Sequence, residues 1–373
     1  MTNARTLFLT VAFAVCSEAA LADVDVEYIA HACFVVASPG GTRVVIDPYN
    51  SSRWLGYHFP DSVKADVVLI THPHYDHDAS YYWGDSVPVF REPGRSRVGD
   101  IELLGVEGHH AGPYGKEFGQ RNTVWLLDTG GVRIAHLGDN GPLTEANVRE
   151  LGRVDVVMLP ADGDDHILKK DEIAAIRRQL GEPLVIPMHY RLDGLRGLPR
   201  SIGPIGPWLD GQAGVVRLDS NRARLPGDKD PDRKVLVFSP SPELERWSDP
   251  LTAAWEALGA ARKIMADDPS RAPEAAVLVK QAADSTDGIV FSFQWARVLA
   301  QSRRTTEAIR VLEGALVRAG RDDWEYRMHA RSLLAELYVK AGRTGDAAAQ
   351  YRLILDRSYR LDLIEKAKAF LEE

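Results

Sequence analysis

The segment His72-Pro73-His74-Tyr75-Asp76-His77 constrains this chain more than any other feature. It follows the apolar run over 67–71, which is typical of a short strand buried on both faces. Residues two apart in an extended segment point to the same side, so His72 and His74 can reach one metal ion together. Asp76 and His77 come where the chain turns, and they face a second position. Three imidazoles and a carboxylate suit zinc or a similar divalent ion, so the sequence predicts a metal site here.

Three more candidate ligands each come at or just beyond the end of a predicted strand: His110, Asp139 and His189. Side chains that converge from the ends of separate strands are the usual way in which a sheet builds a pocket. Spacing alone does not separate His110 from its neighbour His109. With the motif, the sequence offers seven candidate metal ligands.

Strand and helix signals alternate over residues 24–245, which indicates an α/β domain. The segment 24–37 is predicted as a strand, and the turn residues Pro39-Gly40-Gly41 lead into a second strand over 42–46. Beyond about 240–250 the strand signals disappear, and Ala, Leu, Arg and Glu recur at helical spacing. The sequence therefore predicts two domains, over 23–245 and 250–373.

Two segments of the helical part resemble each other. Ala296 corresponds to Ala335 and Ala308 to Ala347, an offset of 39 residues in each pair. The second copy, with Gly342 between its helices, resembles a tetratricopeptide unit, although the offset exceeds the usual ~34 residues. A plain helical bundle without repeat ancestry is the alternative. Both interpretations predict an all-α domain.

Charge and cysteine content exclude several protein classes. The 373 residues include 45 Lys+Arg and 53 Asp+Glu, a formal net charge of −8, which argues against a nucleic-acid partner. The two cysteines, Cys16 and Cys33, do not form a CxxC pair, so a disulfide scaffold and a cysteine-rich zinc module are excluded. No apolar run approaches the ~20 residues of a transmembrane span.

The other histidines receive weaker assignments. We expect His136, inside a strand, to be packed and hydrogen-bonded. The same is expected of His31, with the alternative that it orients a metal ligand. We expect His58 and His166 to lie in loops, and Cys33 to be a buried, unreactive thiol.

Taken together, these motifs resemble the metallo-β-lactamase fold superfamily over about residues 24–192. The H-x-H-x-D-H motif carries the resemblance, and the runs 133–139 and 186–190 sharpen it. They resemble the branch of small metal-dependent hydrolases that includes the L-ascorbate-6-phosphate lactonase-like proteins. His31-Ala32-Cys33-Phe34 and Ile46-Asp47-Pro48 resemble the opening hairpin of that branch. The resemblance implies an α/β four-layer αββα sandwich, here followed by an all-α helical-repeat domain.

The resemblance also implies how the ligands divide between two divalent metal ions at one edge of the sandwich. One ion would be held by His72, His74 and His110; the family pattern Gly-Val-x-x-x-His favours His110 over His109. The other would be held by Asp76, His77 and His189, with Asp139 bridging. Zinc is the expected metal, with manganese or iron as alternatives. Asp76 is also the predicted catalytic residue, because it would orient the shared water and carry its proton.

Two functions follow from these features. The first is an exported hydrolase that uses a metal-bound hydroxide on a small ester, lactone or phosphoester. The alternative is a helical-repeat binding or scaffold protein, with a protein partner on the helices and a metal domain that is structural or vestigial. Seven candidate ligands favour the enzyme, since structural sites tend to be closed and mononuclear. The predicted substrate contacts are Trp54, Tyr57, His58 and Arg191.

The N-terminal segment has the pattern of a signal peptide over residues 1–22. Arg5 precedes an apolar run over 7–16, and Ala20-Leu21-Ala22 is a small-x-small cleavage pattern. The expected location is therefore periplasmic or secreted. Removal of the signal would leave Cys33 as the single cysteine, which suits an oxidising compartment.

We predict that the exported protein begins at Asp23, because cleavage should follow Ala22. N-terminal sequencing of protein recovered from the native host tests this. A soluble cytoplasmic protein that still begins at Met1 or Thr2 would refute it.

Overall fold

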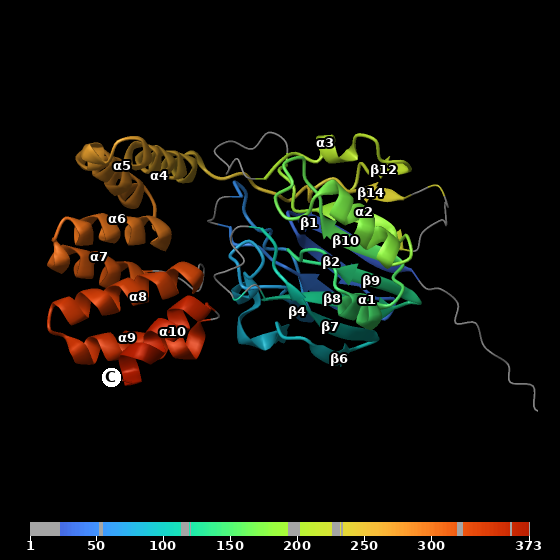
Figure 1. The fold of residues 1–373 in the computed structure, drawn as a ribbon, viewed down its shortest axis with the longest axis horizontal. Helices are drawn as coiled ribbons and strands as arrows, with labels where there is room; N and C mark the ends of the chain where they lie inside the picture. Colours follow the sequence, from blue (N-terminus) through green and yellow to red (C-terminus); the bar gives the residue numbers. More distant parts are fainter. Residues whose placement is uncertain are drawn as a thin grey trace, which may run out of the picture.

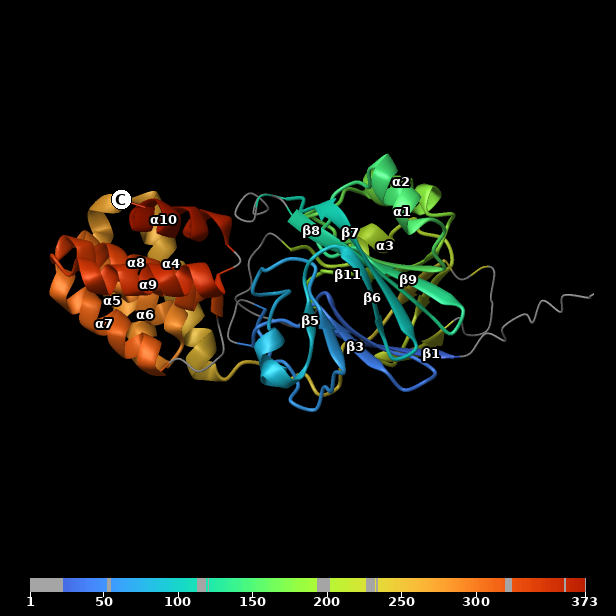
Figure 2. The same cartoon turned by 90° about the horizontal axis from the view of Figure 1, so that it is seen from below.

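The computed structural model describes residues 23–372, apart from 52–54, 113–118, 120, 193–201, 226–231, 233, 319–323 and 359. The predicted signal peptide and Trp54 lie outside the described residues. Two β-sheets form the first part of the chain (Figures 1 and 2). The smaller sheet has the strand order β13-β1-β2-β3-β4-β5, and the larger has the order β12-β14-β11-β10-β9-β8-β7-β6.

The strand bounds are as follows. The smaller sheet contains β1 (Val24–Ala30), β2 (Cys33–Ala37), β3 (Arg43–Ile46), β4 (Val67–Leu69), β5 (Val89–Phe90) and β13 (Arg222–Leu225). The larger sheet contains β6 (Gly94–Val98), β7 (Ile101–His109), β8 (Arg121–Thr129), β9 (Val132–His136), β10 (Val156–Pro160), β11 (Leu184–Met188), β12 (Val215–Arg217) and β14 (Val235–Val237).

The main core lies between the two sheets, where alternate apolar residues of both are buried together, among them Tyr28, Phe34, Trp125 and Met158. The outer face of the larger sheet packs against α1 (Glu145–Leu151), α2 (Lys170–Gln179) and α3 (Gly206–Leu209). The outer face of the smaller sheet is covered by the 3₁₀ helix η1 (Ser80–Ser86) and by irregular chain that carries Tyr49 and Phe59. The predicted metallo-β-lactamase-type sandwich is thus confirmed, with a largely irregular outer layer over the smaller sheet.

The segment 24–37 is a hairpin and not the single strand expected. β1 and β2 pair antiparallel, with Tyr28 opposite Phe34, and the chain reverses at His31 and Ala32. His31 adopts a left-handed backbone with φ 57°, which is unusual for a residue with a Cβ. Val24, Val26 and Tyr28 on β1, and Phe34 and Val36 on β2, face the main core. The alternation breaks before the turn, where the pairing register shifts and both Ile29 and Ala30 pack on the outer face of the sheet.

Strand direction brings the ends of several strands to one edge of the sandwich. β7 and β9 are each antiparallel to β8, and β9, β10 and β11 are mutually parallel, so β7, β9 and β11 point the same way. In the smaller sheet, β3 and β4 are parallel to each other, and the β1–β2 turn lies beside the end of β3. The candidate ligands follow the ends of β4, β7, β9 and β11, and this shared edge is where they meet.

The second part of the chain is helical (Figure 1). Its α-helices are α4 (Asp249–Asp267), α5 (Ala272–Ser285), α6 (Ile289–Gln301), α7 (Thr305–Arg318), α8 (Trp324–Lys340), α9 (Thr344–Arg357) and α10 (Leu361–Glu372). Each packs against the next along the chain. The α6–α7 and α8–α9 pairs bury equivalent positions, including Ala308 and Ala347, while their tetratricopeptide ancestry remains a prediction. Among the described residues, no helix combines the length and hydrophobicity that a membrane span requires.

The chain before α4 is anchored to the sandwich. The His58 amide donates to the Glu245 carbonyl at 2.8 Å, and the Trp247 amide donates to the Gly56 carbonyl at 3.1 Å. The Trp247 indole Nε1–H donates to the Ser51 carbonyl at 2.7 Å, and its ring stacks on Trp255 of α4 at 5.9 Å. The Trp247 side chain thus joins Ser51 to α4.

We predict that Trp247→Ala lowers the free energy of unfolding by about 3 kcal/mol, because it empties a buried aromatic site. Trp247→Phe keeps an aromatic ring for Trp255 and loses only the indole N–H, so it should cost about 1 kcal/mol. Denaturant unfolding of both variants provides the measurement. Equal losses in the two variants would show that the stacked ring does not stabilise this junction.

Candidate metal centre

The first group of donors contains three buried imidazoles. His72 and His74 follow β4, and His110 directly follows β7. His72 Nε2 lies 2.9 Å from His74 Nδ1, and His110 Nε2 lies 3.2 Å from the same atom. Metal–nitrogen bonds of about 2.0–2.1 Å in a tetrahedral site place neighbouring donors at comparable separations. The three nitrogens can therefore hold one ion.

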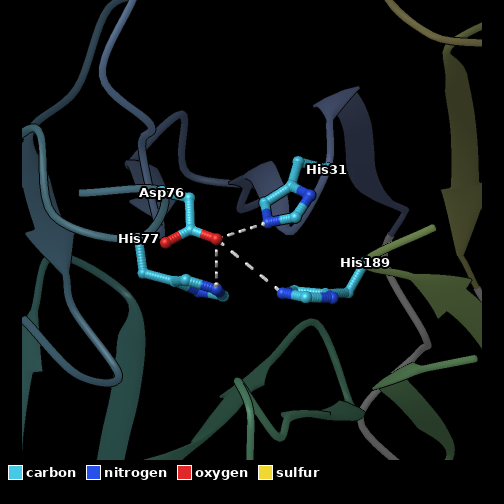
Figure 3. Close-up of side chains that lie close together, drawn as sticks. All are labelled: His31, Asp76, His77 and His189. Carbon is cyan, nitrogen blue, oxygen red and sulfur yellow. Dashed lines mark hydrogen bonds and ion pairs between the residues drawn. The ribbon is translucent and has the colours of Figure 1, made fainter. Parts of the chain in front are cut away.

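The second group surrounds Asp76 (Figure 3). Asp76 Oδ2 lies 3.8 Å from His77 Nε2 and 3.9 Å from His189 Nε2. His31 Nε2 approaches the same oxygen more closely, at 3.1 Å. All four residues are buried, and their donor atoms lie close enough together to surround a single ion.

Asp139 lies between the two groups. Its Oδ1 is 3.4 Å from His77 Nε2, and its Oδ2 is 3.2 Å from His189 Nε2. The same Oδ2 lies 3.6 Å from His110 Nε2, in the first group. One carboxylate thus faces donors of both groups.

Three of the facing atoms have no hydrogen bond within the described residues: His77 Nε2, His189 Nε2 and Asp139 Oδ1. His77 Nε2 and Asp139 Oδ1 are both buried and lack such a partner, although they lie 3.4 Å apart. Buried polar atoms without a partner cost free energy, and their presence in a folded protein requires an explanation. A cation between them satisfies both, so the residues present fit a metal.

The electrostatics of the cluster also favour a cation. Burial alone would lower the pKa of His77, but the carboxylates of Asp139, Asp76 and Asp47 outweigh it and raise that pKa to about 10. Burial would raise the pKa of the Asp76 carboxyl, yet His77 and the hydrogen bond from His31 hold that pKa well below its usual range. The Asp76 carboxylate therefore remains ionised inside the protein, where it attracts positive charge.

Asp47 orients His77 from behind. Its Oδ1 accepts the Thr71 amide at 2.8 Å, and its Oδ2 accepts the Thr71 hydroxyl at 2.7 Å. The same Oδ2 lies 2.8 Å from His77 Nδ1, which donates to it and leaves Nε2 facing the centre. A carboxylate on the far nitrogen of a metal-binding histidine sets its tautomer and ring orientation. The sequence singled out Asp47 only within the family-like run, without this role.

The remaining histidines divide clearly. His109 is exposed at the end of β7, while His110 is buried in the first group, so the geometry selects His110. His136 is buried with Nε2 2.9 Å from the Ala32 carbonyl, as a packed histidine should be. His166 stacks on His189 with ring centroids 5.6 Å apart, a position that its predicted loop did not reveal.

Three of the predicted substrate contacts, Tyr57, His58 and Arg191, belong to the described residues, and they differ in exposure. Tyr57 is buried and packs edge-on against Tyr49 at 5.2 Å. Burial first, and then the charge of Asp76, raises the pKa of the Tyr57 hydroxyl. His58 and Arg191 are half-buried, and the Arg191 amide donates to the Gly203 carbonyl at 2.9 Å.

The chain is similar to known proteins over its first part. Residues 25–189 match the family model described as a beta-lactamase superfamily domain. A UPF0173 metal-dependent hydrolase of Thermococcus kodakarensis is 28% identical over 253 residues, which cover 60% of this chain and 99% of that protein. A second, from Rubrobacter xylanophilus, is 26% identical over 204 residues, covering 44% of this chain and 81% of the relative.

Among solved structures, a metallo-β-lactamase superfamily protein of Thermotoga maritima is 28% identical, with a TM-score of 0.46 and coverage of 58% of this chain and 100% of its own. The family match agrees with the two facing sheets of this domain. Residues 25–189 therefore form a metallo-β-lactamase-fold domain, and the relatives of this domain are metal-dependent hydrolases.

Proposed function

We propose that the protein binds two divalent metal ions and hydrolyses a small ester, lactone or phosphoester. The observation that carries the proposal is the position of Asp139, whose two oxygens face both donor groups. A purely structural site tends to be closed around one ion, whereas a paired site with a shared carboxylate is typical of hydrolytic centres.

We propose that the seven donors divide between the two ions as the family resemblance implies. We assign His72, His74 and His110 to one ion, and Asp76, His77 and His189 to the other, with Asp139 shared. Imidazole and carboxylate donors together suit zinc, and they also accommodate manganese or iron. Zinc is the metal that we propose.

When bound, the two ions would supply an activated water and a Lewis acid for the carbonyl or phosphoryl oxygen. The chain's own residues supply the rest. Asp76, whose carboxylate faces the second donor group, would orient the shared water, accept its proton and deliver it to the leaving group. Asp47 keeps His77 in one tautomer, so the donor set is already ordered before a substrate binds.

The substrate is proposed to enter beside two segments. Tyr57 would form an apolar wall near Asp76, and the half-buried His58 and Arg191 would lie at the rim. An arginine there is suited to a carboxylate or phosphate on the substrate. Trp54, the fourth predicted contact, belongs to the same segment as Tyr57 and His58.

We also propose that the protein is exported to the periplasm or secreted. The signal pattern over 1–22 supports this proposal. Cys33, the one cysteine that would remain, is buried and free, so it offers no accessible thiol to an oxidising compartment.

The test is turnover of a panel of lactones, carboxylic esters, phosphomonoesters and phosphodiesters by the zinc-loaded full-length protein. We expect at least one class to be hydrolysed, and Asp76→Ala to lower kcat by about 10²-fold or more because the proton carrier is lost. Asp66→Ala is the matched control: Asp66 is an exposed aspartate that accepts the Arg43 amide at 2.8 Å just before β4, away from the centre. It should retain full activity.

Two results would contradict the proposal. One is the absence of turnover of the whole panel by wild-type protein that contains metal. The other is an Asp76→Ala variant with kcat near that of the wild type.

A further inference from the structure

We propose that His31 is a positioning residue of the metal centre, whose imidazole holds Asp76 and whose main chain holds His189. This inference deepens the proposed function and rests on it. His31 lies at the turn between β1 and β2, in a segment where the sequence favoured a packed histidine.

The side-chain contact is a hydrogen bond in a dry environment. His31 Nε2 lies 3.1 Å from Asp76 Oδ2, and both residues are buried (Figure 3). His77 Nε2 and His189 Nε2 stand farther from the same oxygen, at 3.8 and 3.9 Å. The shorter separation is that of a donor and its acceptor, and the longer ones suit atoms that share an ion.

Counting donors separates this role from direct metal binding. Asp76, His77, His189 and the shared Asp139 already offer four protein donors to the second ion. His31 as a fifth donor would leave little room for water or substrate, whereas catalytic ions keep an open position. We therefore assign its Nε2–H to Asp76 Oδ2.

The main-chain contact joins the two sheets at the same point. The His31 carbonyl accepts the His189 amide at 2.9 Å, and the Tyr28 hydroxyl donates to the same carbonyl at 3.3 Å. His31 and His189 both have left-handed backbones, with φ of 57° and 59°. Such conformations in residues with a Cβ persist only where surrounding contacts enforce them, and they concentrate at functional sites.

These two contacts act on ligands from different elements. Asp76 comes from the motif after β4 in the smaller sheet, and His189 follows β11 in the larger sheet. A single residue in the β1–β2 turn therefore sets the separation of two ligands proposed for the same ion. Loss of the His31 imidazole should lower the affinity for the ion at Asp76 and His189. The affinity for the ion at His72, His74 and His110 should stay unchanged.

The experiment compares two variants of the full-length protein. His31→Gly removes the imidazole, and glycine tolerates the left-handed backbone that alanine would strain. His31→Gln places a side-chain amide N–H at about the distance from the backbone at which His31 has its Nε2–H. Zinc affinities of both sites are measured by competition with a chelator, and cobalt-substituted protein is followed by its visible absorption spectrum. His109→Gln, at an exposed histidine, serves as the control.

We expect His31→Gly to lower the affinity for one of the two zinc ions by about 10- to 100-fold, the usual effect of losing a residue that orients a ligand. His31→Gln should recover most of that affinity and keep the wild-type cobalt spectrum, because the metal's own ligands are unchanged. If His31→Gly fails to fold, His31→Asn takes its place: asparagine accepts the same backbone, but its amide is too short to reach Asp76.

Three results would overturn the inference. Unchanged zinc affinities in His31→Gly or His31→Asn would show that the His31 imidazole does not position a metal ligand. A His31→Gln variant as weak as His31→Gly would exclude a hydrogen-bonding role, and an altered cobalt spectrum in His31→Gln would make His31 a direct ligand. Failure of the proposed function is distinguishable, because it would show in wild-type protein that binds fewer than two ions or turns over no substrate.

Discussion

The carboxylate of Asp139 lies between two groups of buried imidazoles, and this placement depends on both sheets meeting at their shared edge. A buried carboxylate in an apolar core is costly unless it is paired. Here it is matched by donors that follow β4, β7 and β11, three strands drawn from two different sheets. The parallel course of β7, β9 and β11 places their last residues together, and the apolar core between the sheets keeps β4 opposite them.

A second layer of contacts holds the donors in position. Asp47 fixes the tautomer of His77 and is itself held by Thr71, immediately before the motif. The turn at His31 contacts Asp76 through its side chain and His189 through its main chain. His31, Asp47 and His189 all have left-handed backbones, half of the six such non-glycine residues in the described chain. Strain concentrated at one edge agrees with a site where the donors are ordered before any ligand binds.

Much of this could be predicted from sequence, because the motif is local and strand ends are marked by apolar runs. The sandwich, the helical second part and the meeting of seven donors all follow from such signals. The β1–β2 turn could not be predicted, since the buried residues continue through it from β1 to β2 and His31 supplies no turn chemistry. The contacts of Asp47 and His166 with the metal centre could not be predicted for a related reason. Asp47 contacts His77 and His166 contacts His189, and in both pairs the two residues are distant in the sequence. Trp247 is a similar case. Its hydrogen bond to Ser51 joins two residues that are far apart in the sequence, and its ring stacks on Trp255 of α4.

The central claim is that this edge holds two metal ions, and metal content per chain tests it most directly. The full-length protein would be loaded with zinc, manganese or iron, separated from free metal, and measured by mass spectrometry against protein concentration. The account predicts close to two ions per wild-type chain, and close to one in His110→Ala, which removes a donor from the first group alone. Wild-type protein that retains one ion or none with every metal would contradict it.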